Sequence, residues 1–343
     1  MKKKSSNPLK SILTIVISLA FAGFFLWLAL RDFDVKVVQK SLAKANYLWV
    51  LFAGVFGVLA YWFRAVRWNL LLEPMGHRIS NSNAFWTISF GYLMNLTIPR
   101  SGEVARATAL YGVEKVPVDK SFGTIILERV VDLACMMVFL GLTLIFKYDV
   151  ILSFYENSGI NINPNKIILA ILILIIGAVL FFIFKKKLSK FPILGKIISF
   201  IDGILQGLTS IFKLKQKAKF ILYTAGIWIC YFMAAYLVCF ALPETSDFTV
   251  ADGFFIIVVG TLGMIVPASG GIGAFNLAMK YGFMALFISM GKSAEFGGEM
   301  GLTYSFISLP LQIVIMLTTG LLSIPMLAKA RNKLAAETEI KSV

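Results

Sequence analysis

Long apolar runs separated by short charged segments constrain this chain of 343 residues more than any other feature of its sequence. A bilayer core about 30 Å thick is crossed by about 20 apolar residues of helix. Eight runs approach or exceed that length, at 11–30, 47–66, 122–146, 166–184, 219–242, 250–267, 271–290 and 303–327. Because 58% of the residues are hydrophobic and only 15% are charged, the composition excludes an ordinary soluble domain and a disordered chain. We therefore expect an all-α fold, a polytopic bundle of helices in a membrane.

The Lys and Arg residues predict how this bundle is oriented. The formal net charge is +15. If the amino terminus is cytoplasmic, the cytoplasmic segments carry 22 Lys and Arg against 6 Asp and Glu, whereas the external segments carry 7 against 9. The cytoplasmic segments are 1–10, 64–82, 114–120, 185–219 and 329–343, and the external ones are 31–46, 147–166, 243–252 and 291–302. This bias follows the positive-inside rule, so we expect a multi-pass protein of the cell membrane with both termini in the cytoplasm and no nucleic-acid partner.

The segment 84–113 must enter and leave the membrane on the cytoplasmic side. The run before it ends there, and the run at 122–146 must begin there to reach the acid-containing loop that follows. Pro99 interrupts the helical pattern, and Ser101 and Gly102 follow it directly. These residues predict a re-entrant hairpin with its tip at Pro99.

A second segment resembles this tip. Residues 99–105 read Pro-Arg-Ser-Gly-Glu-Val-Ala and residues 267–273 read Pro-Ala-Ser-Gly-Gly-Ile-Gly, so Pro, Ser and Gly coincide at an offset of 168. Three apolar runs lie between the copies, so the second copy approaches from the opposite side, as in the inverted repeats of many transporters. The halves would be about 47–146 and 219–327 of a single transmembrane domain. A chance match is the alternative, with 250–290 forming two full spans, so the expected total is six to eight spans with one or two re-entrant helices.

Charged residues inside apolar segments mark a candidate site. Ionisable side chains at mid-membrane are costly and usually face a polar cavity or one another. Spacings of three and four residues place such side chains on shared helix faces. We expect a buried cluster made of Arg100, Glu103, Arg106, Glu128, Arg129 and Asp132. Its three Arg and three acids leave it near neutral, and ion pairs that only fix helix packing are the alternative interpretation.

The Gly-rich turn of the second copy is a weaker candidate. Backbone N–H groups at Ser269, Gly270 and Gly271 could hold an anion, with Asn276 just beyond them, although close helix packing through small residues explains the turn equally well. The segment 185–219 has nine Lys and one acid among helically spaced apolar residues, which predicts a basic amphipathic segment at the membrane interface. The three Cys and single His have no metal-ligand spacing, so we expect neither a metal site nor a cofactor.

Several of these motifs together resemble a known family. They are Asn95-x3-Pro-Arg-x-Gly-Glu-x2-Arg106, Glu128-Arg129-x2-Asp132 and Pro267-x2-Gly-Gly-x-Gly273. The combination is similar to the lysylphosphatidylglycerol synthase transmembrane family, also called uncharacterised protein family 0104, over about 10–327. The resemblance implies a flippase-like helical bundle that handles anionic or aminoacylated lipids. Bifunctional relatives also carry a soluble aminoacyl-transfer domain, and the residues after the last run are too few for one.

The combined expectation is a lipid transporter that is not an enzyme. The Arg side chains of the cluster would contact a lipid phosphate, and its acids would hold those Arg side chains when the site is empty. The alternative is a membrane enzyme, or an accessory subunit, that acts on a lipid-linked phosphate or sugar. The expected partners are membrane lipids, together with a partner enzyme or a second copy of the chain.

Overall fold

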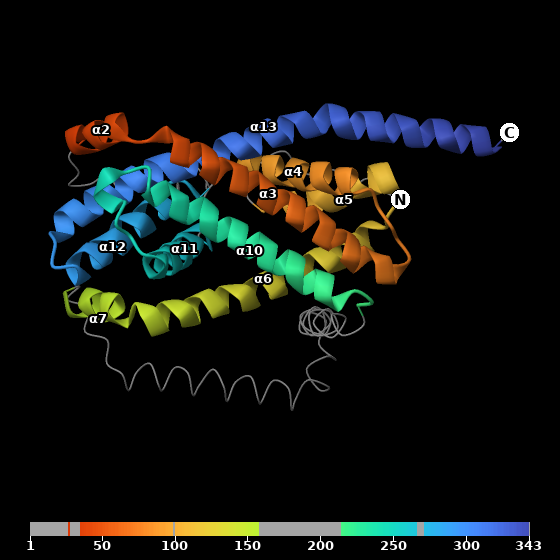
Figure 1. Ribbon diagram of the computed structural model, residues 1–343. Helices are drawn as coiled ribbons and strands as arrows, with labels where there is room; N and C mark the ends of the chain where they lie inside the picture. Colours follow the sequence, from red (N-terminus) through yellow and green to blue (C-terminus); the bar gives the residue numbers. More distant parts are fainter. Residues whose placement is uncertain (1–26, 28–34, 99, 158–213, 266–270, 343) are drawn as a thin grey trace, which may run out of the picture.

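Helices form all the regular structure of the described residues in this computed structural model, which describes residue 27 and residues 35–98, 100–157, 214–265 and 271–342 (Figure 1). They are α2 (Val35–Lys44), α3 (Tyr47–Leu72), α4 (Asn81–Thr97), α5 (Gly102–Glu114), α6 (Val118–Phe146), α7 (Tyr148–Asn157), α10 (Lys217–Cys239), α11 (Val250–Ile265), α12 (Ala274–Ser289) and α13 (Ala294–Ser342), with 3-10 turns at Glu73–Met75 and Pro243–Thr245. The expected all-α membrane fold is therefore confirmed.

Within the described part of the chain, four helices are long and apolar enough to cross a bilayer. They are Tyr47–Met75, Val118–Phe146, Lys217–Cys239 and Ala294–Ala336, and they contain most of the runs predicted at 47–66, 122–146, 219–242 and 303–327. Helix α13 continues well beyond the bundle toward the carboxyl terminus (Figure 1). The run at 11–30 except residue 27, the run at 166–184, and all but the end of the basic segment 185–219 lie outside the described residues.

Helices α4 and α5 form the first hairpin, as predicted. With 17 and 13 residues, each is shorter than the length that crosses a bilayer. The two backbones meet at Gly91 and Gly102, where a Cβ on Gly102 would collide with the Gly91 carbonyl oxygen and the Asn95 side chain. Only glycine permits this approach. The turn between the helices includes Arg100, whose φ of 61° is left-handed; Pro99 lies outside the described residues.

Helices α11 and α12 form a second hairpin of similar dimensions. Each has 16 residues, and they cross where Gly263 faces Ala278. The tips of the two hairpins meet, because Arg100 Nη2 donates a hydrogen bond of 3.3 Å to the carbonyl oxygen of Ile265. Short helices of about 24 Å favour a second re-entrant hairpin over two full spans.

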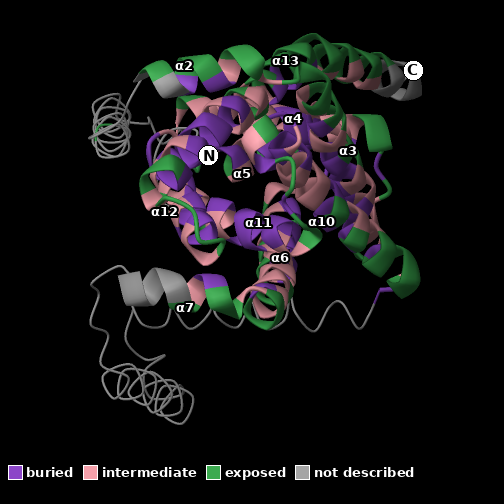
Figure 2. Cartoon of the chain, turned by 60° about the vertical axis from the view of Figure 1, so that its left-hand side comes forward, coloured by how far each residue is buried: buried purple, intermediate pink, exposed green. Residues whose placement is uncertain are grey.

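The helices of the two halves pack across one another. Each half consists of a long helix, two short ones and a long one: α3 to α6 in the first and α10 to α13 in the second. Helix α3 packs against α10, α4 against α13, and α11 against α6. Buried residues concentrate where the helices meet, while large apolar side chains such as Leu51, Ile145 and Ile221 remain more than 60% exposed on the outside (Figure 2). Such an apolar exterior suits contact with hydrocarbon.

Candidate functional site

An Arg–Glu pair joins the first hairpin to α6. Arg106 Nη1 and Nη2 on α5 donate hydrogen bonds of 2.7 and 3.1 Å to the two carboxylate oxygens of Glu128 on α6. The side chains are 7% and 1% exposed. The Arg106 guanidinium also lies 3.6 Å from the ring centre of Trp68 on α3, whose indole nitrogen donates to Thr124 Oγ1. Contacts from α3, α5 and α6 therefore hold this pair.

Two Arg residues on α3 bind the second carboxylate of α6. Arg64 Nη2 and Arg67 Nη2 donate to the two oxygens of Asp132 at 2.8 and 3.1 Å. Arg64 also lies 3.7 Å from Glu128 and donates to the Tyr231 hydroxyl on α10 at 3.1 Å. Both Arg side chains are at most 4% exposed. Asp132 thus connects α6 with α3, a contact that the residues around Asp132 in the sequence did not predict.

These two Arg residues were not predicted to belong to the site. Their positions, at the end of the run at 47–66 and in the segment 64–82, indicated a cytoplasmic flank, whereas α3 continues as an apolar helix to Leu72. Two features of the sequence indicated otherwise. The spacing of three residues places both Arg side chains on one face of a helix, and the apolar residues that follow them allow that helix to continue.

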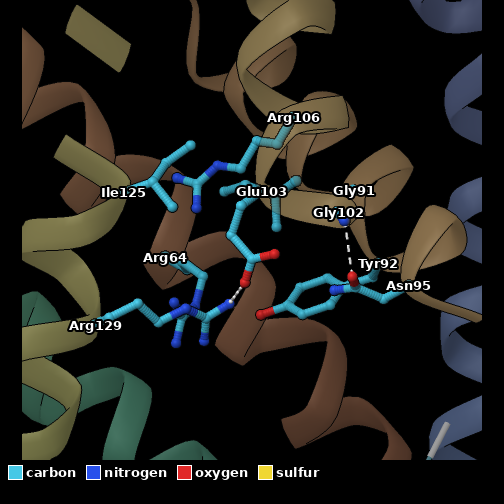
Figure 3. Close-up of a pocket in the computed structure, with 10 residues that line it drawn as sticks. Arg64, Gly91, Tyr92, Asn95, Gly102, Glu103, Arg106, Ile125 and Arg129 are labelled. Atoms are coloured by element: carbon cyan, nitrogen blue, oxygen red, sulfur yellow. Dashed lines mark hydrogen bonds and ion pairs between the residues drawn. The ribbon is translucent and has the colours of Figure 1, made fainter. Parts of the chain in front are cut away.

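The third ion pair, between Arg129 and Glu103, is the most exposed pair of the cluster. Arg129 Nη2 on α6 donates to Glu103 Oε1 on α5 at 2.7 Å. The two side chains are 52% and 26% exposed, far more than the other pairs of the cluster. Figure 3 shows the Glu103 carboxylate reaching toward Arg129, with Arg64 beside them and Arg106 on the other side. Among the described members of the cluster, Arg129 and Glu103 are thus the pair best placed to exchange partners.

The structure brings together five of the six residues predicted for the cluster: Glu103, Arg106, Glu128, Arg129 and Asp132. Arg100, the sixth, forms none of the described ion pairs: its left-handed backbone lies at the hairpin tip, and its side chain donates to the carbonyl oxygen of Ile265. With Arg64 and Arg67 added, four guanidinium groups face three carboxylates. The described cluster therefore carries one net positive charge rather than being near neutral.

The other predicted residues that the structure describes, Asn95, Gly271 and Asn276, lie in or beside the two hairpin turns. Asn95 Oδ1 accepts the Gly102 N–H at 2.8 Å, and Asn276 Oδ1 accepts the Gly273 N–H at 3.0 Å. Asn276 is 1% exposed and also donates to Ser305 on α13 at 2.7 Å. The oxygen and the nitrogen of its amide are therefore both hydrogen-bonded, and these bonds fix the second hairpin against α13. Gly271 has a φ of 74° in that turn; Ser269 and Gly270 lie outside the described residues.

A large cavity of about 530 Å³ adjoins the cluster. Its polar end is lined by Arg64, Arg129 and Asp132 together with three tyrosines, Tyr61, Tyr92 and Tyr231. The rest of its wall is mostly apolar and comes from both halves of the bundle, including Ala53, Gly57, Leu133, Met136, Ile256, Ile257, Met264, Phe275, Met279, Leu311, Ile315 and Met316. This volume lies in the range of small-molecule sites. One cavity thus combines a cationic end with a long apolar wall.

A second, much smaller cavity of about 20 Å³ lies on the hairpin side of the cluster (Figure 3). Its wall includes Arg64, Arg106, Arg129 and Glu103, and it shares Arg64, Arg129 and Tyr92 with the large cavity. Tyr92 lines both cavities and stacks on Tyr61, which lines the large one, with ring centres 4.4 Å apart. Together the two spaces can accept an anion that guanidinium groups approach from several directions.

Comparison with known proteins agrees with the motifs. The family model described as "Lysylphosphatidylglycerol synthase TM region" matches residues 15–324. The protein named "UPF0104 membrane protein MJ1595" of Methanocaldococcus jannaschii is 27% identical over 129 residues, which are 37% of this chain and 38% of that relative. No solved structure matches the chain. Since the family model covers most of its length, the chain belongs to the family of lysylphosphatidylglycerol synthase transmembrane regions.

Proposed function

We propose that this protein moves an anionic phospholipid across the membrane through the large cavity without changing it chemically. The observation that carries this proposal is the joining of a cationic end, at Arg64 and Arg129, to a long apolar wall in one space. A lipid has the same division between a charged headgroup and apolar chains. We further propose that the protein works in the cell membrane with both termini in the cytoplasm, in keeping with the bias of its Lys and Arg residues.

Arg129 is the group that we propose to bind the phosphate. Its guanidinium is half exposed, lines both cavities and has a single ion-pair partner, Glu103, among the described residues. A phosphate can replace that carboxylate, because both accept two parallel N–H bonds from one guanidinium. The more buried pairs, Arg106 with Glu128 and Arg64 with Asp132, would keep Arg129 and its helix in place during the exchange.

The cavity wall offers a route for the acyl chains. Leu133 on α6 and Ile265 on α11 line the cavity and are 60% and 56% exposed, so the cavity reaches the apolar outer surface of the bundle. On that surface the surroundings are hydrocarbon. The chains would therefore remain in the bilayer while the headgroup moves past the cluster.

The charge of the cluster favours an anionic headgroup over a cationic, aminoacylated one. Four guanidinium groups against three carboxylates leave one positive charge for a phosphate to neutralise. The excess positive charge would repel an additional ammonium group on the lipid. Only an ion pair between that ammonium and Glu103, formed after Glu103 separates from Arg129, would offset this repulsion.

We also propose that the halves α3–α6 and α10–α13 are inverted repeats that exchange access between the two faces. Their matching order of long and short helices, their crossed packing and the contact between the hairpin tips support this. In transporters built this way the site lies near mid-membrane between the repeats. The large cavity, which residues of both halves line, would correspond to that site.

Liposomes that contain the purified protein test the proposal. Fluorescent phosphatidylglycerol in one leaflet should become accessible in the other leaflet, and mass spectrometry should recover it unchanged. Recovery of a modified lipid would favour the alternative of a membrane enzyme. Movement that requires a second protein would favour an accessory subunit, and no movement of any anionic lipid would contradict the proposal.

A further inference from the structure

The small cavity beside the cluster has room for one small ion or water and no more. Its volume is about 20 Å³, whereas a single water requires at least about 10–15 Å³. A phosphate group cannot enter it whole. The large cavity must therefore serve the lipid headgroup, and the small one needs a separate explanation.

Two Arg residues that line this cavity have guanidinium N–H groups without an acceptor among the described residues. Arg64 and Arg106 both line it and are 3% and 6% exposed, and the Nε atom of each has no hydrogen-bond acceptor among the described residues. Buried donors of charged groups are seldom left unpaired. Arg129 lines the same space, so three of the four Arg residues in the cluster surround it, with Glu103 as the one carboxylate in its wall (Figure 3).

We propose that this cavity binds a monatomic anion of the halide class, such as chloride, when the lipid site is empty. A water molecule would satisfy the unpaired N–H groups but would leave the net positive charge of the cluster uncompensated, which is costly within a membrane. A halide does both. Glu103 opposes it, so the binding is expected to be weak enough to reverse.

The halide would leave or shift when a phosphate reaches Arg129, because both anions draw on Arg64 and Arg129. The anion then acts as a counter-ion for the empty transporter and competes with lipid. This assignment needs only the charge and geometry of the cluster, and it does not depend on transport taking place.

Thermal unfolding of delipidated protein in detergent tests the proposal. We compare sodium chloride, sodium bromide and sodium gluconate at equal ionic strength, since gluconate is too large for the cavity. Chloride and bromide should raise the melting temperature saturably, and gluconate should not. Identical curves in the three salts would overturn the proposal, even if lipid transport is observed.

Three variants localise the effect. Glu103→Gln should lower the half-saturating halide concentration several-fold, because it removes the carboxylate from the cavity wall. Arg129→Gln should abolish the halide dependence. Arg78→Gln is the control and should retain it, because Arg78 is exposed, pairs with Glu73 and lines neither cavity. A halide effect that survives Arg129→Gln, or that Glu103→Gln leaves unchanged, would place the ion elsewhere and contradict the assignment.

A fluorescence readout gives independent support. Trp68 is fully buried under the Arg106 guanidinium, so bromide in the small cavity would lie close enough to quench it. Saturable quenching by bromide should be present in the unaltered protein and reduced in Trp68→Phe. Quenching that rises linearly with bromide in both proteins would show collisions only and count against a site.

Discussion

Arg106 and Glu128 form a two-pronged hydrogen-bonded ion pair, at 2.7 and 3.1 Å, that is almost completely sealed from solvent. It connects the first hairpin to α6. The exposed pair of the same cluster, Arg129 with Glu103, lies one residue further along α6 and three residues earlier on α5. The interface between α5 and α6 thus contains a buried pair that holds the two helices together and an exposed pair whose members can exchange partners.

Loss of one partner of the buried pair should destabilise the folded protein. Removing one partner, as in Arg106→Met or Glu128→Met, leaves the other charge buried and should cost about 3–5 kcal/mol. The double variant should be more stable than either single variant, because no unpaired charge remains. Thermal unfolding in detergent measures all three. Single variants as stable as the unaltered protein would show that these charges are not confined as described.

The hairpin crossing should depend on the absence of a side chain at Gly102. Gly102→Ala places a methyl group against the Gly91 carbonyl oxygen and should destabilise the protein by about 1–3 kcal/mol. Gly112→Ala is the matched control on the same helix, since its new methyl group meets nothing within 4 Å. The control should be neutral or slightly stabilising. Equal effects of the two changes would contradict the close backbone approach.

Arg100 should be dispensable for headgroup binding. Arg100→Asn removes the charge and the bond to Ile265 but suits the left-handed backbone, where Asn is tolerated. Lipid movement in liposomes should stay within about twofold of the unaltered protein. Arg100→Val, which is strained at that φ, should lower the melting temperature instead. A loss of transport in Arg100→Asn as severe as that from altering Arg129 would return this residue to the site.

The sequence predicted the helices and much of the cluster because both follow from local patterns. Apolar length determined the spanning helices, and Glu128, Arg129 and Asp132 were conspicuous within one of them. The hairpin around Pro99 followed from the charge bias of the segments on either side. These inferences required no knowledge of which helices are neighbours.

The features that the sequence did not predict are relationships between helices and the conformation of one turn. Arg64 and Arg67 resembled the cationic flank of a membrane span, and only the packing of α3 on α10 and beside α6 places them against Asp132. Arg100 shared a short motif with Glu103 and Arg106, yet its positive φ turns it toward the second hairpin. Neither the partner of a charge nor the left-handed turn is encoded in residue spacing alone.

The rate of lipid movement in liposomes containing Arg129→Gln shows whether a headgroup passes Arg129, with Arg78→Gln reconstituted at equal density as the control for loss of one Arg. We expect Arg129→Gln to slow the movement of phosphatidylglycerol at least tenfold while its melting temperature stays near that of the control. We also expect Arg129→Lys to recover only part of the rate, because an ammonium cannot offer two parallel donors. Unchanged movement in Arg129→Gln would contradict the claim that a headgroup passes this residue.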